Sequence, residues 1–574
     1  MISRGLASGL TLLLLWNATA CVAPAREQAP ADLIVTNAVI YTGDPEQPWA
    51  ESLAVRGGRL AHVGAADRLA ALRGPHTRSF DAGGKLVLPA FHDAHVHPVS
   101  SGIELGQCDL NGAASVTELL DRIAAYAKAH PDLPWILGGG WDMPLFAEGN
   151  PGSKMLDRVV GDRPALLSSA DGHSSWASSR ALAAAGVTRD TPDPSRGHIE
   201  RDGKTGEPSG TLREEAVDLV RRHAPERTEP ERREGLRRAL VELNRFGIVS
   251  VQEANAGRKV LDTYLAAERE GWLTTRVRVS LSVDPAAGEA QVPALVEQRS
   301  ACKGRRVSCG TAKIFVDGVI EARTAALLSP YVTPANMQPP AAASGIANFE
   351  PAALNAIVTR LDKEKFQVHL HAIGDRAIRM GLDAIQAARE VNGPRDARHH
   401  IAHIQLFDPA DIPRFAALGV VANFQPLWAY ADPYITDLTE PVLGPDRSKW
   451  LYPIRALYDS GAVVAAGSDW SVSSLNPLDA IQVAVTRRAP DAPAGEAWLP
   501  EQLVDLPRIL NAYTMGGAFV NFEENDSGSL APGKYADFIV LDRNIFKSPV
   551  TAIHEAKVLW TVMEGSDVYR APEL

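Results

Sequence analysis

The central part of the chain alternates short apolar, β-branched runs with longer segments of helical periodicity. This alternation is typical of a parallel sheet whose strands are connected by helices. Eight runs are predicted to be strands: residues 85–95, 248–253, 276–283, 311–316, 367–371, 399–404, 419–424 and 462–466. Eight parallel strands with intervening helices predict an α/β fold of the (β/α)8 TIM-barrel type.

The predicted strands are unevenly spaced at one place. Residues 102–246 separate the first strand from the second, which is far more than an ordinary connection. A loop that leaves the carboxyl end of a barrel strand emerges on the active-site face. We therefore expect this insertion, which includes a predicted helical segment at 212–222, to cover the pocket.

Both ends of the chain have a different pattern, in which strands are joined by Gly/Pro turns. Residues 31–41 and 52–63 are predicted strands, and 529–541 and 558–569 repeat this character at the far end. We expect segments 31–84 and 526–574 to form one β-sandwich from both ends of the chain. It would lie beside a barrel domain of residues 85–525.

Length and charge narrow the classes of partner. The 574 residues suffice for a barrel with an insertion and a second domain. With 58 Lys+Arg against 69 Asp+Glu, the formal net charge is −11, and no long basic run is present. Nucleic acid is therefore not an expected partner. A small-molecule substrate is expected, and a homo-oligomer is compatible with the sequence.

The first residues predict export from a bacterial cell. Arg4 precedes an apolar stretch, 6–16, that is too short to span a membrane, and small residues follow. Two processing sites compete: Ala18-Thr19-Ala20-Cys21 resembles a loose lipobox, whereas Ala23-Pro24-Ala25 fits ordinary cleavage after Ala25. Because cysteine is scarce, we favour a signal of residues 1–21 and a periplasmic or lipid-anchored lipoprotein.

The other cysteines do not predict a structural zinc site. Cys108, Cys302 and Cys309 are too few and too unevenly spaced. In an oxidising compartment Cys302 and Cys309 could close a small disulfide loop, and two unlinked thiols are equally compatible with the sequence.

Candidate metal-ligand residues lie at the ends of the predicted strands. His95 and His97 end the apolar run 88–98, and their spacing turns both imidazoles to one side of a strand. Imidazole pairs of this kind favour a first-row cation, most often zinc. Four further polar residues occur at the corresponding ends of other strands: Lys313, His371, His403 and Asp469. A lysine among apolar strand residues is unusual, because burial of an ammonium group is costly.

The order His-x-His, Lys, His, His and Asp on strands one, four, five, six and eight resembles the amidohydrolase superfamily. The runs Asp171-Gly172-His173, 313–318, 371–376 and 529–541 are similar to its branch that contains the N-substituted formamide deformylases. The resemblance implies a barrel, a composite β-sandwich and one or two divalent metal ions, with zinc expected. It implies that Lys313 carries a carboxylate (N6-carboxylysine). It also implies five direct ligands: His95, His97, His371, His403 and Asp469.

Strand alternation places His369 on the same face as His371, so strand geometry does not decide which of the two is a metal ligand. Only the family motif favours His371. The family usually has Asn-Ser where this chain has Ser178-Ser179, and Gly-Ser where it has Val319-Ile320. Those positions are expected to face the substrate, so the resemblance leaves the substrate open.

Further roles follow from the predicted chemistry. Asp469 is expected to transfer the proton of the attacking water. His173 either stabilises an oxyanion, holds substrate or makes hydrogen bonds within its loop. Trp141 and Asp171 are candidate substrate contacts, and Arg323 either binds a substrate carboxylate, pairs with Glu321 or caps a helix.

These features predict a metal-dependent hydrolase of carbon–nitrogen bonds in non-peptide amides, such as N-acyl or N-formyl amines. A lactone or cyclic-imide hydrolase is the alternative enzyme, because the same centre attacks other activated carbonyls. A lipid-anchored binding protein without catalysis is a further alternative, which the retention of all six candidate ligands disfavours.

Overall fold

The computed structural model describes residues 29–335, 339–492 and 494–574. The predicted signal, 1–21, and both processing sites, at Cys21 and Ala25, lie outside these residues. Within the described ranges, no helix has both the length and the apolar character needed to cross a membrane.

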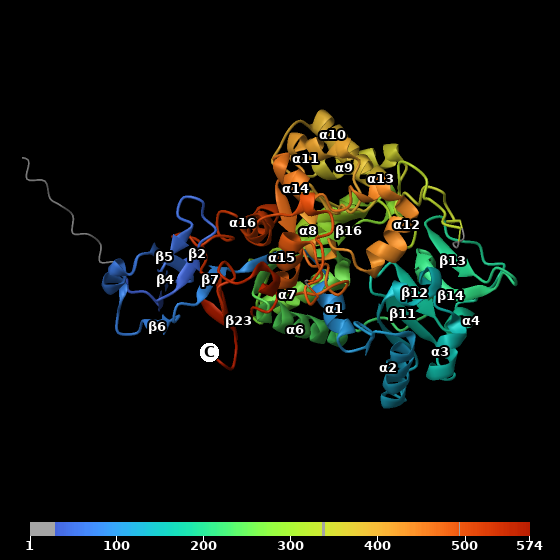
Figure 1. Cartoon of the computed structure of the whole chain (residues 1–574), viewed down its shortest axis with the longest axis horizontal. Coiled ribbons are helices and arrows are strands. Elements are labelled where there is room, and N and C mark those ends of the chain that lie inside the picture. The colour runs from blue at the N-terminus through green and yellow to red at the C-terminus, as the bar shows by residue number, and fades with distance from the viewer. Residues whose placement is uncertain (1–28, 336–338, 493) are drawn as a thin grey trace, which may run out of the picture.

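Eight parallel strands form the central sheet, and this confirms the predicted barrel fold (Figure 1). In sheet order they are β8 (Phe91–Val96), β15 (Ile248–Ala256), β16 (Arg276–Ser282), β17 (Val307–Phe315), β18 (Gln367–Ala372), β19 (His400–His403), β20 (Val421–Phe424) and β21 (Val464–Ala466). The two ends of the sheet meet beyond β21, where Asp469 N donates to His95 O at 2.7 Å and His97 N donates to Trp470 O at 3.2 Å.

Amphipathic helices cover the outside of this sheet. Helix α10 (Asp375–Asn392) buries Ile378, Leu382 and Ile385, whose spacing places them on one face. Helix α6 begins with a capping box between Thr228 and Glu231. The principal helices of the barrel are α6 (Glu229–Arg245), α7 (Arg258–Arg269), α8 (Val292–Ala301), α9 (Pro351–Lys363), α10, α11 (Ile412–Leu418), α14 (Ile454–Asp459) and α15 (Pro477–Thr486).

The two chain ends form one β-sandwich, as predicted. One sheet contains β1 (Leu33–Thr36), β4 (Ser52–Arg56), β5 (Arg59–Gly64) and β6 (Arg78–Asp81). The other contains β2 (Val39–Tyr41), β3 (Trp49–Ala50), β7 (Leu86–Pro89), β22 (Phe538–Leu541), β23 (Val558–Met563) and β24 (Ser566–Arg570). Val35 and Val55 from the first sheet share a core with Phe538 and Trp560 from the second. In Figure 1 the blue strands of the chain's beginning therefore lie beside the red strand β23.

The predicted first barrel strand, 85–95, is in fact two strands. β7 pairs with β2 and β22 of the sandwich, whereas β8 pairs with β15 of the barrel. The chain changes sheets at Ala90, which follows Pro89 and whose N–H donates to Asp537 O at 3.1 Å. Both strands are buried, so the apolar run continues across the junction and hides the boundary.

The insertion forms a separate mixed sheet of six strands at the end of the molecule opposite the sandwich (Figure 1). Its strands are β9 (Cys108–Asp109), β10 (Ile136–Trp141), β11 (Ala165–Ser169), β12 (Ser174–Ala177), β13 (Gly197–Arg201) and β14 (Pro208–Glu214). Its principal helices are α2 (Val116–Ala129), α3 (Ser153–Val160), α4 (Ser179–Ala184) and α5 (Ala216–Arg221). The segment 212–222 is therefore helical only after Glu214, because Leu212 and Arg213 pair with β12 and β13.

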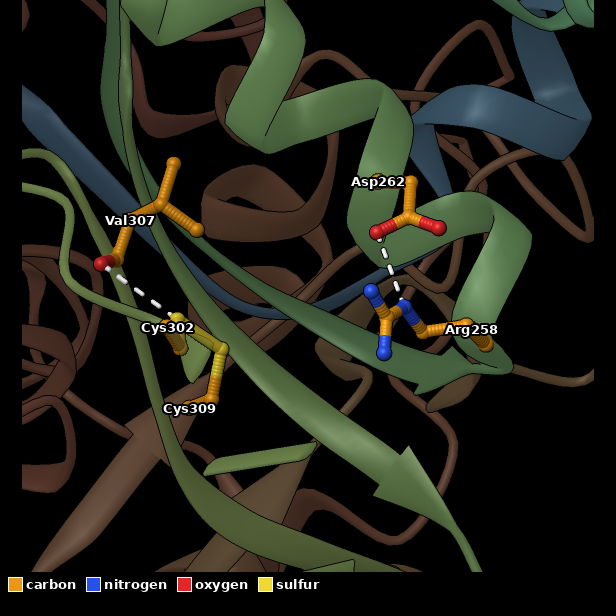
Figure 2. Close-up of a disulfide and its surroundings, with 5 residues drawn as sticks. All are labelled: Arg258, Asp262, Cys302, Val307 and Cys309. Carbon is orange, nitrogen blue, oxygen red and sulfur yellow. Dashed lines mark hydrogen bonds and ion pairs between the residues drawn. A yellow bond between two sulfur atoms is a disulfide. The ribbon is translucent and has the colours of Figure 1, made fainter. Parts of the chain in front are cut away.

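Cys302 and Cys309 form a disulfide between the end of α8 and β17 (Figure 2). This pairing resolves the two alternatives that the sequence leaves open. Cys108 is a buried free thiol.

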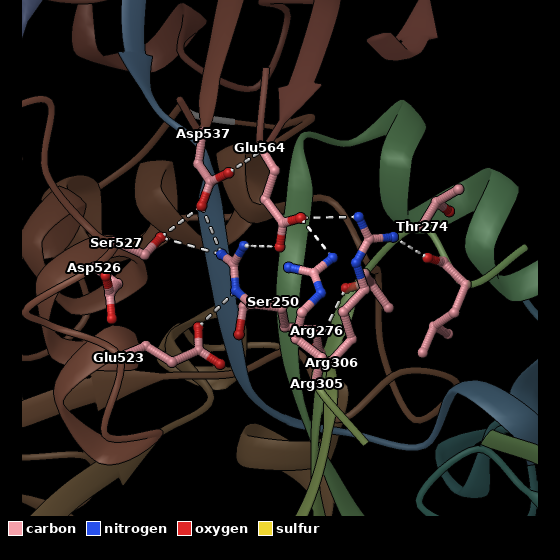
Figure 3. A network of polar contacts seen from close by, with 12 residues as sticks. Ser250, Thr274, Arg276, Arg305, Arg306, Glu523, Asp526, Ser527, Asp537 and Glu564 are labelled. Carbon is pink, nitrogen blue, oxygen red and sulfur yellow. Dashed lines mark hydrogen bonds and ion pairs between the residues drawn. The ribbon is translucent and has the colours of Figure 1, made fainter. Parts of the chain in front are cut away.

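A buried charge network joins the barrel to the sandwich near the amino ends of the barrel strands (Figure 3). Arg276, the first residue of β16, donates to Asp537 Oδ2 at 2.7 Å and to Glu523 Oε2 at 3.0 Å. Arg305 and Arg306 both reach Glu564 Oε2 at 2.9 Å. Asp537 and Glu564 belong to the sandwich segment, so these ion pairs connect the two domains.

We predict that Arg276→Met lowers the free energy of unfolding by about 3–5 kcal/mol, because it leaves buried carboxylates without their cation. The exposed pair Arg258–Asp262, also drawn in Figure 2, offers the control. Arg258→Met should cost no more than about 1 kcal/mol. Denaturant unfolding of both variants measures the difference, and equally small losses would show that the network does not stabilise the fold.

Candidate metal centre

The first strand of the barrel positions His95 and His97 over the carboxyl end of the sheet. Asp93, on the same strand, accepts hydrogen bonds from His95 N at 3.1 Å and from Ser468 N at 3.0 Å. Gly467 lies so close to this strand that a Cβ atom there would meet His95 N at 2.5 Å. The contact therefore requires glycine, and it brings the loop after β21 against the two histidines.

His95, His403 and Asp469 form the one group of metal-capable residues found among the described residues. One ligand atom from each lies within 4.8 Å of those from the other two, and all three residues are buried. His95 Nε2 is 3.4 Å from Asp469 Oδ1, and His403 Nδ1 is 3.8 Å from Asp469 Oδ2. His403 Nδ1 is buried and accepts no hydrogen bond from the described residues. A divalent cation fits this set, because it would satisfy that nitrogen and the carboxylate together.

Both His403 and Asp469 have left-handed backbone conformations, with φ of 75° and 53°. Such conformations cost energy for residues other than glycine and are concentrated at functional sites. Here the left-handed backbone directs the side chains of both residues towards the candidate metal position.

The other three candidate ligands surround this group. His97 Nε2 is 3.2 Å from Asp469 Oδ1, and Lys313 Nζ is 3.4 Å from His95 Nε2. The ring of His371 lies 4.4 Å from that of His403, and its Nε2 is 3.2 Å from Gly318 O. The structure thus gathers all six residues that the sequence singles out.

Two further residues orient these histidines: His369, which strand geometry leaves as an alternative to His371, and Glu253, which the sequence pattern does not single out. His369 Nε2 lies 2.9 Å from His95 Nδ1, which leaves His95 Nε2 directed at the centre. Glu253 Oε1 lies 3.5 Å from His97 Nδ1, and its Oε2 accepts from Tyr264 at 2.8 Å. Their only sequence signal is a polar residue within an apolar strand, which does not distinguish an orienting residue from a ligand.

Burial holds several of these groups in their neutral forms. Burial lowers the pKa of Lys313 to about 7, although Asp469 and Glu253 oppose the change. Burial lowers the pKa of His403 to about 3 and moves the pKa of His95 and His371 well below its usual value. Neutral imidazoles keep a lone pair for a metal, and a neutral amine is a nucleophile.

His173 enters the site from the turn between β11 and β12 of the insertion. Its Nδ1 lies 2.9 Å from Glu214 Oε2, and its ring lies 5.1 Å from that of His371. Burial lowers the pKa of His173, but the charge and hydrogen bond of Glu214 outweigh burial and raise this pKa to about 9. The imidazole therefore carries positive charge at neutral pH beside the candidate ligands.

Two cavities meet at this centre, and His173, Asp171, His371, His403 and Asp469 line both. One cavity, of about 230 Å³, extends beneath Trp428 and Tyr434. The other, of about 580 Å³, extends past His95, Lys313 and Glu214. The insertion thus provides walls of both cavities.

Three residues expected at the substrate do not line either cavity. Trp141 is fully buried in the core of the insertion, where its indole donates to Leu167 O at 2.8 Å. It therefore packs inside the insertion and does not contact either cavity. Arg323 lies 3.8 Å from Glu148 Oε2. Ser178 caps helix α4. By contrast, Asp171, Val319 and Glu321 do line the cavity of about 230 Å³.

Comparisons with known proteins agree with this geometry. Residues 78–569 match the family described as "Amidohydrolase family". The chain is 32% identical to "Protein LONG AFTER FAR-RED 3" of Arabidopsis thaliana, over 94% of this chain and 92% of that protein. It is 26% identical to "N-substituted formamide deformylase" of Arthrobacter pascens, over 93% and 97%. A solved structure of an uncharacterized metal-dependent hydrolase from Pyrococcus horikoshii OT3 superposes with a TM-score of 0.69 and 26% identity, over 90% of this chain and 99% of that one.

We predict that a chelator lowers the melting temperature of the purified protein, because a metal bound only by the folded state stabilises it. The gain is about 4 kcal/mol when free metal exceeds its Kd a thousandfold. His95→Ala should bind less metal and lose this response, whereas the control His76→Ala, at an exposed position, should retain both. Elemental analysis and thermal unfolding with and without chelator test this, and an unchanged metal content in His95→Ala would remove His95 from the centre.

Proposed function

Because the chain belongs to the amidohydrolase family, we propose that this metal-dependent hydrolase cleaves carbon–nitrogen bonds of non-peptide amides, such as N-acyl or N-formyl amines. The convergence of His95, His403 and Asp469 between two cavities carries the proposal. The printed name of the Arthrobacter relative, an N-substituted formamide deformylase, supports the choice of amides.

The proposed centre contains zinc, as one or two ions, held by His95, His97, His371, His403 and Asp469. Lys313 contributes as a carboxylate. Its neutral amine forms a bond to the carbon of CO2 and releases one proton, which converts a buried base into an anion. Burial that lowers the pKa of Lys313 to about 7 favours this step. When bound, a divalent metal supplies activation of water near neutral pH and polarisation of the scissile carbonyl.

The chain's own residues then move the protons and hold the substrate. Asp469 is a carboxylate whose pKa is lowered: burial raises this pKa, but the hydrogen bond to His97 and the neighbouring basic groups together outweigh burial. It takes the proton of the attacking water and returns it to the leaving nitrogen. His173, charged through Glu214, stabilises the negative charge that develops on the carbonyl oxygen.

A lactone or cyclic-imide hydrolase remains the second candidate, because the same residues would act on those carbonyls. The name of the Arabidopsis relative does not describe an enzyme, but this chain contains all six candidate ligands. A panel of amides, lactones and imides, assayed with metal-loaded protein, separates the candidates.

Export also remains a proposal, which the Cys302–Cys309 disulfide supports, because such bonds persist in oxidising compartments. Cell fractionation with a Cys21→Ala variant would separate a lipid-anchored protein from a free periplasmic one.

We predict that Asp469→Asn lowers kcat by about 10²- to 10⁴-fold while much of the metal remains, because an amide cannot accept the proton. Lys313→Ala should instead lose metal and activity together, since it removes a proposed ligand. A short carboxylic acid at high concentration should restore part of both. Metal content and kcat of the two variants test this division of roles. Full activity of Asp469→Asn with its metal retained would exclude Asp469 as the proton carrier and leave His173 as the next candidate.

A further inference from the structure

The cavity of about 230 Å³ has an unusual charge distribution away from the metal ligands. Four carboxylates line it, from Asp142, Asp171, Glu321 and Asp432, and its lining contains no lysine or arginine. In the described part of the chain, none of these four carboxylates forms an ion pair with a basic side chain. All four side chains are partly buried, and the charged imidazole in the lining, His173, already pairs with Glu214, so this wall favours a ligand that brings positive charge.

The hydrogen bonds of these carboxylates are made with neutral groups. Glu321 Oε1 accepts from Gln405 Nε2 and from Thr439, both at 2.8 Å. Asp432 Oδ1 accepts from Ile435 N at 2.9 Å, and Asp142 Oδ1 accepts from Tyr434 at 3.3 Å. These bonds fix the carboxylates in place and leave their charge uncompensated. Burial raises the pKa of Asp432 to about 7, and the nearby Glu321 and Asp142 add to the rise.

Two further polar groups in the wall lack partners. Tyr452 and Gln405 are each only 2% exposed, and both line the cavity. The described residues provide no hydrogen bond to the Tyr452 hydroxyl or to Gln405 Oε1. Both oxygens accept hydrogen bonds, so they are suited to a ligand that donates.

Aromatic rings provide the remaining surface. Tyr430, Tyr434 and Tyr452 line the cavity, and Trp428 stacks on His403 with ring centroids 5.6 Å apart and an interplanar angle of 7°. The faces of such rings attract cations. Trp428 also connects this wall to the metal centre, so one molecule could contact both.

The spacing of the carboxylates indicates an organic cation and not a bare metal ion. Among the described residues, His95, His403 and Asp469 have ligand atoms within 4.8 Å of one another, and no three acids of this wall do. No three of these carboxylates are therefore placed to share one ion, but they can surround a larger group.

We propose that Asp142, Glu321 and Asp432, together with Tyr430, Tyr434 and Tyr452, form a cation pocket that binds a positively charged group of the substrate. The substrate class is then amides that carry an ammonium, guanidinium or quaternary ammonium group away from the scissile bond. This inference rests on the proposed amide hydrolysis and narrows it.

Three amides of equal chain length test the proposal with metal-loaded enzyme: N-formylhexanediamine, N-formylhexylamine and N-formylaminohexanoate, which end in an ammonium, a methyl and a carboxylate group. We expect kcat/KM for the ammonium substrate to exceed that for the neutral one by about 10- to 100-fold, as for hydrogen bonds to charged groups. The carboxylate substrate should be the poorest. Equal values for the three would overturn the cation pocket while leaving amide hydrolysis established.

Asp432→Asn should reduce the ratio of ammonium to neutral kcat/KM towards one. Tyr430→Leu should reduce it in part, which provides a second variant if the first folds poorly. The matched control is Asp437→Asn, an exposed acid five residues after Asp432, on the short helix Tyr434–Thr439, that does not line the cavity. It should retain the full ratio, and an unchanged ratio in both Asp432→Asn and Tyr430→Leu would contradict the assignment.

A binding measurement separates this inference from the proposed function. Tetramethylammonium cannot ligate a metal, so a rise in melting temperature of the metal-loaded enzyme, relative to sodium at equal ionic strength, reports the pocket alone. We expect this rise in the parent and in Asp437→Asn, and its loss in Asp432→Asn. If no amide is hydrolysed, the proposed function fails and this measurement still decides the pocket; no rise in the parent overturns it.

Discussion

The carboxylate of Asp93 holds the first strand of the barrel against the loop that follows the last. It is buried, and it accepts from the backbone of His95 and of Ser468, which belong to opposite ends of the eight-stranded sheet. Burial raises the pKa of Asp93 to about 7, although these hydrogen bonds oppose the rise. Without this carboxylate, two backbone N–H groups would be buried without partners. His95 and Asp469 would then lose the contact that fixes their positions relative to each other. The close approach at Gly467 imposes the same constraint sterically.

The ion pairs that join the two domains and the candidate metal centre lie at opposite ends of the barrel. The ion pairs of Arg276 with Asp537 and Glu523 lie where the sandwich meets the amino ends of the strands. The candidate metal centre lies at the carboxyl ends, where each strand gives way to a loop. This separation allows the strained backbone at His403 and Asp469 to persist, because the packed strands beneath hold both residues in place.

The sequence predicts the barrel well because its strands are buried on both faces and read as separate apolar runs. Position along a strand indicates the candidate ligands because parallel strands bring their carboxyl ends to one edge of the sheet. The choice of His371 over His369 comes only from the resemblance to the family. Orienting residues could not be identified in this way. Glu253 and His369 have the same local pattern as a ligand, and only the contacts of His97 and His95 reveal their role. Trp141 was expected at the substrate, but it is fully buried at the end of strand β10, whose glycines are only partly buried.

The insertion connects substrate choice to catalysis. It supplies His173, which pairs with Glu214 beside the candidate ligands, and it supplies Asp142 and Asp171, which line the same cavity as Glu321 and Asp432 of the barrel. The turn 170–173 therefore contributes an acid that lines the cavity, Asp171, and, two residues later, the imidazole of His173 beside the candidate ligands. Because these groups share one short turn, a change in the insertion that shifts the acid also shifts His173. Substrate preference and rate are therefore expected to change together when this turn changes, while the ligands on the barrel strands remain in place.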